Sequence, residues 1–303
     1  MNSTPTAVLY AATVLIWGST WVMVKYQLGF VPVQVSLGYR FAIAALALAA
    51  YGRLRNRRLG IEREDLPAVA VQGILMFSVN YFFIYAGTAY LASGLVAVLF
   101  TVMVLFNAVN ERFFYGTAIE PLGLLAGVMA LAGIALMFWP EISELTLSDE
   151  TFKGIVLILI GSYMASLGNM AAIRNTRRKL PVIAVNVWGM GIGASASVIF
   201  AAVTGAPFVI DWQFSYLSSL LFLAIPGTAI AFGLYLVILD RIGATRSSYI
   251  AVMLPVVALL ISTVFEGYRW TQSALIGLLI SLGGNALALT VKPANKRQSV
   301  RGS

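Results

Sequence analysis

Long, uninterrupted apolar runs fill most of this 303-residue chain. Each run is about 20 residues long, the length that an α-helix needs to cross the hydrocarbon core of a bilayer. The runs are apolar on all sides and do not alternate with a period of two, which favours helices over a membrane barrel. Only 11% of the residues are charged, against roughly a quarter in soluble domains. We therefore expect lipid, and not water, around most of the surface.

The apolar runs predict ten membrane-spanning helices with charged connections between them. The expected bounds are Thr6–Tyr26, Val33–Tyr51, Leu66–Thr88, Ala92–Glu111, Leu122–Trp139, Gly154–Ile173, Val182–Thr204, Tyr216–Leu239, Ser247–Glu266 and Ser273–Val291.

The basic residues support this count, because nearly all of them fall on one side of the expected membrane. The connections after the even-numbered spans and the C-terminal tail hold all but four of the 20 Lys and Arg residues. The exceptions are Lys25, Arg40, Lys153 and Arg269. Cytoplasmic loops are enriched in Lys and Arg, so we expect both chain ends in the cytoplasm. The net charge of +8 then reflects membrane topology, and we expect no nucleic-acid partner.

The two halves of the chain resemble each other. Aligning Glu111 at the end of the fourth span with Glu266 at the end of the ninth pairs Ala92 with Ser247. The charge bias of matching connections is reversed between the halves. The connection after the second span is rich in Arg, while its counterpart after the seventh has no basic residue. A repeated unit of five helices requires this reversal when its second copy is inverted.

The predicted fold class is therefore an all-α membrane protein with ten transmembrane helices in two inverted five-helix repeats. The first repeat covers residues 1–140 and an acidic periplasmic linker follows over 141–153. The second repeat and a basic cytoplasmic tail occupy residues 154–303. Inverted repeats are typical of alternating-access transporters, which hold their substrate near the bilayer midplane between the repeats.

The absence of His and Cys removes the residues of most hydrolytic, redox and metal chemistry. No pair of carboxylates lies inside a span, so a membrane-embedded enzyme has no evident reacting groups. We expect no enzymatic activity, no cofactor and no metal. A channel is a weaker alternative, because no filter of charged rings or repeated carbonyl loops is visible.

Polar and aromatic residues within the spans are the candidates for lining a substrate cavity. The candidates are Trp17, Ser78, Tyr81, Tyr85, Tyr163 and Ser247. Ser78, Tyr81 and Tyr85 share one face of a helix. Each candidate also has a structural interpretation, since aromatic residues form interfacial belts and Ser hydroxyls bond between membrane helices.

Four further residues are assigned structural or gating roles. Arg40 is a basic residue well inside a span, where a charge costs ~2.5–3.5 kcal/mol on insertion scales and normally has a partner. It either binds helix-end carbonyls, which we favour, or binds a substrate carboxylate. Glu111 and Glu266 form a symmetric pair at helix ends, which is typical of structural locks more than of proton carriers. Pro255 is expected to bend the ninth span.

Several of these motifs resemble EamA-type members of the drug/metabolite transporter superfamily. They are the Trp17-Gly18-Ser19 element, the Arg40-Phe41 pair, and the matching spans that end in Glu111 and Glu266, with Pro255 in the second copy. The resemblance covers nearly the whole chain. Within the superfamily the chain is similar to YddG-type exporters of aromatic and other amino acids.

The resemblance implies a secondary transporter of the bacterial inner membrane that exports amino acids or related small metabolites. It implies a central cavity with Trp17, Ser78, Tyr81, Tyr85, Tyr163 and Ser247 at matching positions. A nucleotide-sugar or purine transporter of the same superfamily is the alternative, but a phosphorylated substrate calls for several buried cations and only Arg40 qualifies. The expected partners are a small-molecule substrate and the lipid bilayer. The oligomeric state stays open, since a monomer is able to enclose the pathway.

Overall fold

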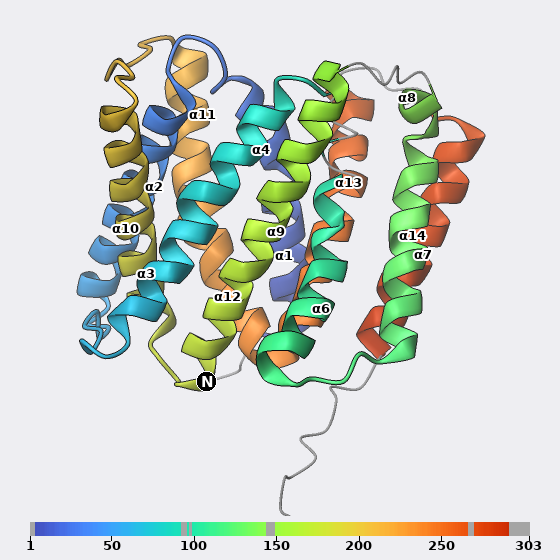
Figure 1. Cartoon of the computed structure of the whole chain (residues 1–303), viewed down its shortest axis with the longest axis horizontal. Helices are drawn as coiled ribbons and strands as arrows, with labels where there is room; N and C mark the ends of the chain where they lie inside the picture. Colours follow the sequence, from blue (N-terminus) through green and yellow to red (C-terminus); the bar gives the residue numbers. More distant parts are fainter. Residues whose placement is uncertain (1–3, 92–95, 97–98, 144–148, 266–269, 291–303) are drawn as a thin grey trace, which may run out of the picture.

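The protein is a bundle of α-helices (Figure 1). The structure is a computed structural model and describes residues 4–91, 96, 99–143, 149–265 and 270–290. These residues contain no β-strand, so the predicted all-α class is confirmed for them. The number of membrane spans and the inversion of the second half remain predictions.

Each apolar run of the sequence overlaps one or more helices in the described part of the chain, although for the fourth run, Ala92–Glu111, the overlapping helix begins only at Met103. The helices are α1 (Thr6–Lys25), α2 (Val33–Leu54), α3 (Leu66–Ile74), α4 (Asn80–Thr88), α6 (Met103–Tyr115), α7 (Pro121–Met137), α8 (Trp139–Ser143), α9 (Asp149–Arg177), α10 (Val182–Val203), α11 (Phe214–Ala224), α12 (Ala231–Ile242), α13 (Ala244–Phe265) and α14 (Gln272–Thr290). Among the described residues, five continuous helices are long and apolar enough to cross a membrane, namely Val33–Leu54, Leu66–Thr88, Asp149–Arg177, Val182–Val203 and Phe214–Ile242.

Two of these long helices contain a short π-helical stretch near their middle. The stretch η1 (Leu75–Val79) joins α3 to α4, and η2 (Ile225–Ile230) joins α11 to α12. In η2 the cause is visible in the sequence, because Pro226 has no N–H to donate to the preceding turn. A π-helical turn leaves backbone carbonyls available to side chains, and such turns occur often at functional sites.

The helices pack in a regular arrangement (Figure 1). The pair α2 and α10 forms one flank of the bundle, and the pair α7 and α14 forms the opposite flank. Between them, α9 packs against α4 and α6, while α1 packs against α12 and α13. Likewise α10 contacts α3, and α2 contacts α11. Each of these contacts joins a helix of residues 4–143 to a helix of residues 149–290, and most of them occur in matching pairs.

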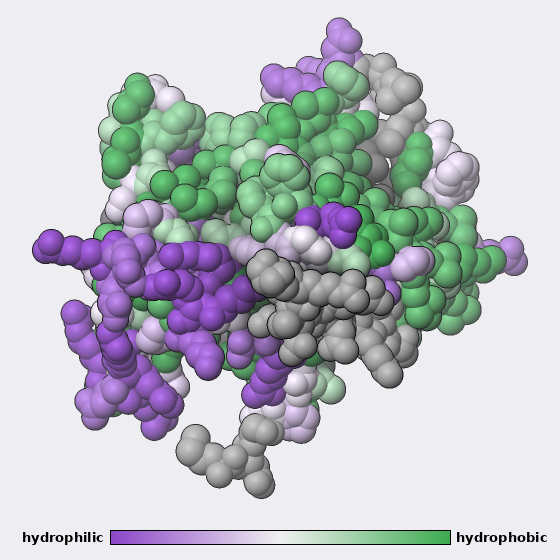
Figure 2. Space-filling view, turned by 60° about the horizontal axis from the view of Figure 1, so that its bottom comes forward, coloured by the Kyte–Doolittle hydropathy of each residue, from purple (hydrophilic) through white to green (hydrophobic). Residues whose placement is uncertain are grey.

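Hydrophilic side chains gather at the end of the bundle that Figure 2 turns forward. Here the exposed arginines of the connection between α2 and α3 lie close to the end of α9. This basic end includes Arg53, Arg55, Arg57, Arg58, Arg63, Arg177, Arg178 and Lys179. The flanks of the bundle carry many large exposed apolar side chains, among them Leu46, Phe113 and Leu279. The surface therefore has the polarity of a membrane protein.

Glycines allow α10 to approach α3 and η1 closely. A Cβ atom added at Gly193 would lie 2.7 Å from Cβ of Phe77 and 2.8 Å from the carbonyl oxygen of Gly73. Backbone atoms in such a contact cannot move aside as a flexible side chain can. Small residues at helix interfaces are the usual means of close packing in membranes, where apolar surface alone gives no drive for association.

We expect Gly193→Ala to lower the free energy of unfolding by about 1–3 kcal/mol, because the added methyl overpacks this interface. The matched control is Gly191→Ala in the same helix, where an added Cβ meets no atom within 4 Å. Both changes favour the helical backbone equally. Thermal unfolding in detergent measures the difference, and equal melting temperatures for the two variants would contradict the proposed contact.

Candidate functional site

A cavity lies in the centre of the bundle, between helices of both halves. Its volume is about 100 Å³. One water molecule needs roughly 10–15 Å³ of such a volume, so the cavity has room for a small organic molecule. The lining is mostly apolar and aromatic, and it consists of Trp17, Thr20, Val24, Arg40, Met76, Asn80, Tyr81, Ile84, Tyr85, Phe100, Met103, Ala165, Asn169, Phe232, Tyr235, Ser247, Ile250, Ala251 and Leu254.

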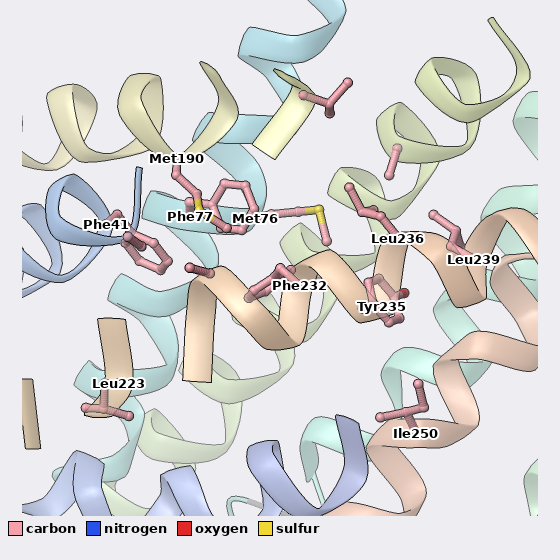
Figure 3. Close-up of a cluster of buried hydrophobic side chains, with 14 of the residues drawn as sticks. Phe41, Met76, Phe77, Met190, Leu223, Phe232, Tyr235, Leu236, Leu239 and Ile250 are labelled. Carbon is pink, nitrogen blue, oxygen red and sulfur yellow. The ribbon is translucent and has the colours of Figure 1, made fainter. Parts of the chain in front are cut away.

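Aromatic rings from α1 and α12 form one wall of the cavity. The ring centroid of Trp17 lies 4.9 Å from that of Phe232 and 5.2 Å from that of Tyr235. Phe232 also contacts Phe77 edge to face at 4.8 Å. Figure 3 shows Phe232 and Tyr235 following each other along α12, with Phe77 and Phe41 of the first half in the same cluster. This wall offers π faces to an apolar group of a ligand.

The π-helical stretch η2 fixes two groups at the edge of the cavity. The indole Nε1 of Trp17 donates a hydrogen bond to the carbonyl oxygen of Gly227 at 3.0 Å. The hydroxyl of Thr228 donates to the carbonyl oxygen of Leu223 at 2.7 Å. Both carbonyls belong to the irregular region around Pro226. The irregular backbone thus orients Trp17 and leaves the lone pairs of the Thr228 hydroxyl available as acceptors.

Arg40 brings a positive charge into the cavity. Its side chain is only 2% exposed. Nε donates to the hydroxyl of Thr228 at 3.0 Å, and Nη1 donates to the hydroxyl of Tyr85 at 3.3 Å. The guanidinium carbon lies 4.7 Å from the ring centroid of Tyr81 and 5.2 Å from that of Phe41, in cation–π contact. Thr228 belongs to the second half, so Arg40 links the two halves across the cavity.

An amide and hydroxyl network borders the cavity on the side of α9. Tyr235 donates from its hydroxyl to Oδ1 of Asn169 at 2.9 Å, and Nδ2 of Asn169 donates to Oδ1 of Asn107 at 3.3 Å. In α4, Oδ1 of Asn80 is buried without a hydrogen-bond partner. A buried acceptor of this kind is costly unless a ligand or water satisfies it.

The structure brings together most of the predicted substrate-binding residues. Trp17, Tyr81, Tyr85 and Ser247 all lie in the cavity lining, with Arg40 beside them. The hydroxyl of Ser247 donates to the carbonyl oxygen of Gly243 at 2.6 Å, which leaves its lone pairs as acceptors. Their role in binding a substrate stays a prediction.

Two predicted residues lie elsewhere. Ser78 is buried between η1 and α10, where its hydroxyl is 2.8 Å from that of Ser197. Tyr163 is 39% exposed and packs edge to face against Phe106, with 5.3 Å between ring centroids. Neither residue lines the cavity. The hydroxyl of Ser78 is used in helix packing, and α9 turns Tyr163 away from the cavity, so we do not include them in the candidate site.

The remaining residues with predicted structural or gating roles lie outside the cavity lining or outside the described part. Glu111 is largely buried in α6 and does not line the cavity. Pro255 belongs to α13, but its side chain is not among the described ones. Glu266 lies outside the described residues. The symmetric pairing of Glu111 with Glu266 therefore stays a prediction.

Sequence reasoning missed Phe232, Tyr235 and Thr228. A signal for them exists in the internal repeat, because Tyr235 lies ten residues after the start of η2, as Tyr85 does after the start of η1. Aligning the third and eighth spans would have paired these two tyrosines. The same alignment pairs Thr228 with Ser78, but the contact of Thr228 with Arg40 joins distant parts of the chain and could not be predicted from the sequence.

A second polar centre lies at the basic end of the bundle. Asp65 is 2% exposed, and its Oδ1 accepts a hydrogen bond from Nη1 of Arg174 at 2.7 Å. It also forms an ion pair with Arg178, whose Nε lies 2.9 Å from Oδ1. Arg178 also pairs with Glu64. The Asp65 and Glu64 carboxylates raise the pKa of the Arg178 guanidinium, so it stays charged. This cluster connects the start of α3 to the end of α9.

The chain matches a known protein family along most of its length. The profile of the EamA-like transporter family matches residues 4–139 and 152–290. A solved crystal structure shares the fold with a TM-score of 0.76 at 19% identity, covering 93% of this chain and 96% of that one.

The curated relatives are described as transporters. The chain is 24% identical to the uncharacterized transporter YoaV of Bacillus subtilis, over 88% of this chain and 90% of that protein. It is 29% identical to the uncharacterized inner membrane transporter YedA of Escherichia coli, over 84% of this chain and 81% of that protein. A probable amino-acid metabolite efflux pump of Salmonella typhimurium is 21% identical, over 89% of this chain and 90% of the pump.

Proposed function

This chain belongs to the EamA-like transporter family, and we propose that it is a secondary transporter that exports amino acids or related small metabolites by alternating access. The observation that carries the proposal is the central cavity, whose walls come from both halves of the chain. Apolar and aromatic walls with a few polar groups are typical of binding sites for small organic molecules.

The lining of the cavity favours a small, partly apolar solute. Trp17, Phe232 and Tyr235 offer aromatic faces, while Asn80 and Ser247 offer hydrogen-bond acceptors. Arg40 is the single Lys or Arg among the described lining residues. A phosphorylated solute carries two or more negative charges, and Arg40 alone would not neutralise them. An amino acid therefore fits this cavity better than a nucleotide-sugar.

Three observations support an inverted pair of five-helix repeats. The family profile matches in two separate stretches, 4–139 and 152–290. The contacts of α9 with α4 and α6 correspond to those of α1 with α12 and α13. The π-helical stretches η1 and η2 occupy matching helices. Two related units around a shared central site are the arrangement on which alternating access depends.

We further propose that the basic end of the bundle faces the cytoplasm, with both chain ends on that side. The concentration of exposed Arg and Lys at this end (Figure 2) supports the orientation, since cytoplasmic connections carry the excess of basic residues. A bacterial inner membrane is the proposed location, in keeping with the inner membrane relative of Escherichia coli.

The printed description of the Salmonella relative supports the proposed class of solute, since it names a probable amino-acid metabolite efflux pump.

Counterflow into proteoliposomes tests the function. Vesicles with the purified protein are loaded with unlabelled Phe, Trp, Met or Thr, and uptake of the same labelled amino acid is measured. We expect uptake above that of empty vesicles for at least one of the four. Absence of uptake for all four would contradict the proposed export of amino acids.

A pair of tryptophan variants shows whether counterflow uses the cavity. Ala251 lines the cavity and is 4% exposed, so an indole at this position fills the space and Ala251→Trp should block uptake. The matched control is Ala132→Trp on the exposed face of α7, which should retain the wild-type rate. Equal rates in the two variants, at equal amounts of inserted protein, would place the pathway elsewhere.

A further inference from the structure

Arg40 has no counter-charge among the residues that the structure describes. Within the described part of the chain, its guanidinium contacts neutral groups, namely the hydroxyls of Thr228 and Tyr85 and the rings of Tyr81 and Phe41. The ion pairs of the described residues do not include it. A buried guanidinium cannot lose its proton to relieve the cost of burial. A charge in this position normally has a partner of opposite sign.

The guanidinium also has unused donors. It carries five N–H groups in a fixed plane, and the bonds to Thr228 and Tyr85 use one on Nε and one on Nη1. Three donors remain, including both on Nη2, and Arg40 faces the cavity. One N–H on Nη1 and one N–H on Nη2 point in parallel in a guanidinium, and such a pair matches the two oxygens of a carboxylate.

The surroundings hold the guanidinium in place for such a ligand. The hydroxyl of Thr228 donates a hydrogen bond to the carbonyl oxygen of Leu223. Its oxygen therefore remains available to accept a hydrogen bond from Nε of Arg40. The rings of Tyr81 and Phe41 contact the guanidinium group. An arginine fixed by these contacts loses little conformational freedom when it binds a planar anion.

The described lining contains no acidic group that would pair with the ammonium group of a ligand. None of the described residues around the cavity is Asp or Glu. An ammonium group would meet only the aromatic faces and neutral acceptors such as Oδ1 of Asn80. A ligand that brings one negative charge balances Arg40, whereas a ligand with only a positive charge adds a second unpaired cation.

We propose that Arg40 binds the carboxylate of the solute, and that the carboxylate, not the amino group, is what the cavity requires. The ligand class is a small monocarboxylate with an apolar or aromatic group, of which neutral amino acids are one kind. The carboxylate lies against Arg40 and the apolar group against Trp17 and Phe232. This inference rests on the proposed function, because it concerns the same cavity, and it restricts the solute to small monocarboxylates.

Four compounds with the same phenyl group separate the two charged groups of an amino acid. Phenylalanine has both, 3-phenylpropionate has only the carboxylate, and phenethylamine and phenylalaninamide have only the amine. The measurement is the rise in melting temperature of the purified wild-type protein in detergent, since a ligand that binds the folded state stabilises it. We expect both carboxylates to raise the melting temperature, and neither carboxylate-free amine to do so.

Variants of Arg40 then test whether its guanidinium binds the carboxylate. Arg40→Gln should weaken binding of phenylalanine and 3-phenylpropionate roughly ten- to a hundredfold, because a charge-assisted pair of hydrogen bonds is lost. Arg40→Lys retains the charge without the planar guanidinium, so its affinity for the two carboxylates should lie between those of Arg40→Gln and the wild type. The matched control is Lys153→Gln, which removes an exposed positive charge in contact with the ring of Tyr90 and should leave binding unchanged.

The wild-type panel keeps the inference testable even if the Arg40 variants do not fold. Stabilisation by phenethylamine or phenylalaninamide as large as that by phenylalanine would overturn it, as would the lack of any response to both carboxylates. Unchanged affinity in Arg40→Gln would overturn the role of Arg40. Carboxylate-selective stabilisation without counterflow of any amino acid would leave the inference standing and contradict the transport function instead.

Discussion

Replacing Asp65 by alanine is expected to lower the free energy of unfolding by about 2–4 kcal/mol. Its carboxylate is buried and pairs with both Arg174 and Arg178. Loss of the carboxylate leaves Arg174 without its acidic partner, while Arg178 keeps its pair with Glu64. The cost stays below that of a fully buried pair, because the side chain of Arg174 is 34% exposed and water partly compensates its charge. The negative charge of Asp65 also stabilises the N-terminus of α3, which follows directly.

Thermal unfolding of the purified protein in detergent checks this prediction. The matched control is Glu62→Gln in the same connection, where Glu62 pairs with Arg58 and the two side chains are 64% and 70% exposed. Such an exposed pair contributes at most about 1 kcal/mol. The melting temperature of Asp65→Asn should fall between those of Asp65→Ala and the wild type, since asparagine retains a hydrogen-bond acceptor without the charge. Equal melting temperatures for Asp65→Ala and Glu62→Gln would refute a stabilising ion-pair cluster at the basic end.

Changes at the two tyrosines beside Arg40 should reduce transport at least about tenfold. Tyr85→Phe removes the hydroxyl that accepts from Nη1 of Arg40, and a hydrogen bond to a charged donor is worth about 1.5–3 kcal/mol. Tyr81→Ala removes the ring that lies 4.7 Å from the guanidinium carbon. Both changes release Arg40 from its position at the cavity, so the initial rate of counterflow should decrease without loss of inserted protein.

Two further tyrosines show whether the effect is specific to the cavity. Tyr51 is 48% exposed at the surface and provides the control variant Tyr51→Ala. Tyr163→Ala tests whether Tyr163 belongs to the substrate cavity, as the sequence predicted, or lies outside it, as in the structure. With the ring of Tyr163 packed on Phe106 outside the cavity lining, we expect a rate close to wild type. Wild-type rates in both Tyr81→Ala and Tyr85→Phe would remove these residues from the site.

Hydrophobicity was enough to locate the helices. The predicted span Leu66–Thr88 coincides with the helix found there, and the predicted span Val182–Thr204 ends one residue beyond its helix. A backbone in lipid has to satisfy its hydrogen bonds internally, so an apolar run of the right length leaves the helix as the only simple solution. Hydrophobicity did not place the π-helical stretches, and η1 contains no proline that would have indicated it.

The sequence was less informative about which side of each helix faces the cavity. In soluble helices the polar face identifies the solvent side, but a helix such as α9 is apolar both where it meets lipid and where it meets protein. Ser78 and Tyr85 lie seven residues apart, close to two helical turns, and share a predicted face. Only Tyr85 reaches the cavity, while Ser78 meets Ser197. The irregular turn η1 contains Ser78 and changes the rotation of the helix between these two residues.

The apolar runs with basic connections therefore determined that this chain is helical, where its helices lie, and which of its ends is basic. Those properties follow from transfer free energy and charge, which are additive along the sequence. The tertiary structure alone decided that Arg40, Thr228 and Tyr85 meet at one cavity. Contacts between residues almost two hundred positions apart in sequence depend on how each helix is rotated and packed against its neighbours. In a uniformly apolar helix, composition carries little information about that rotation.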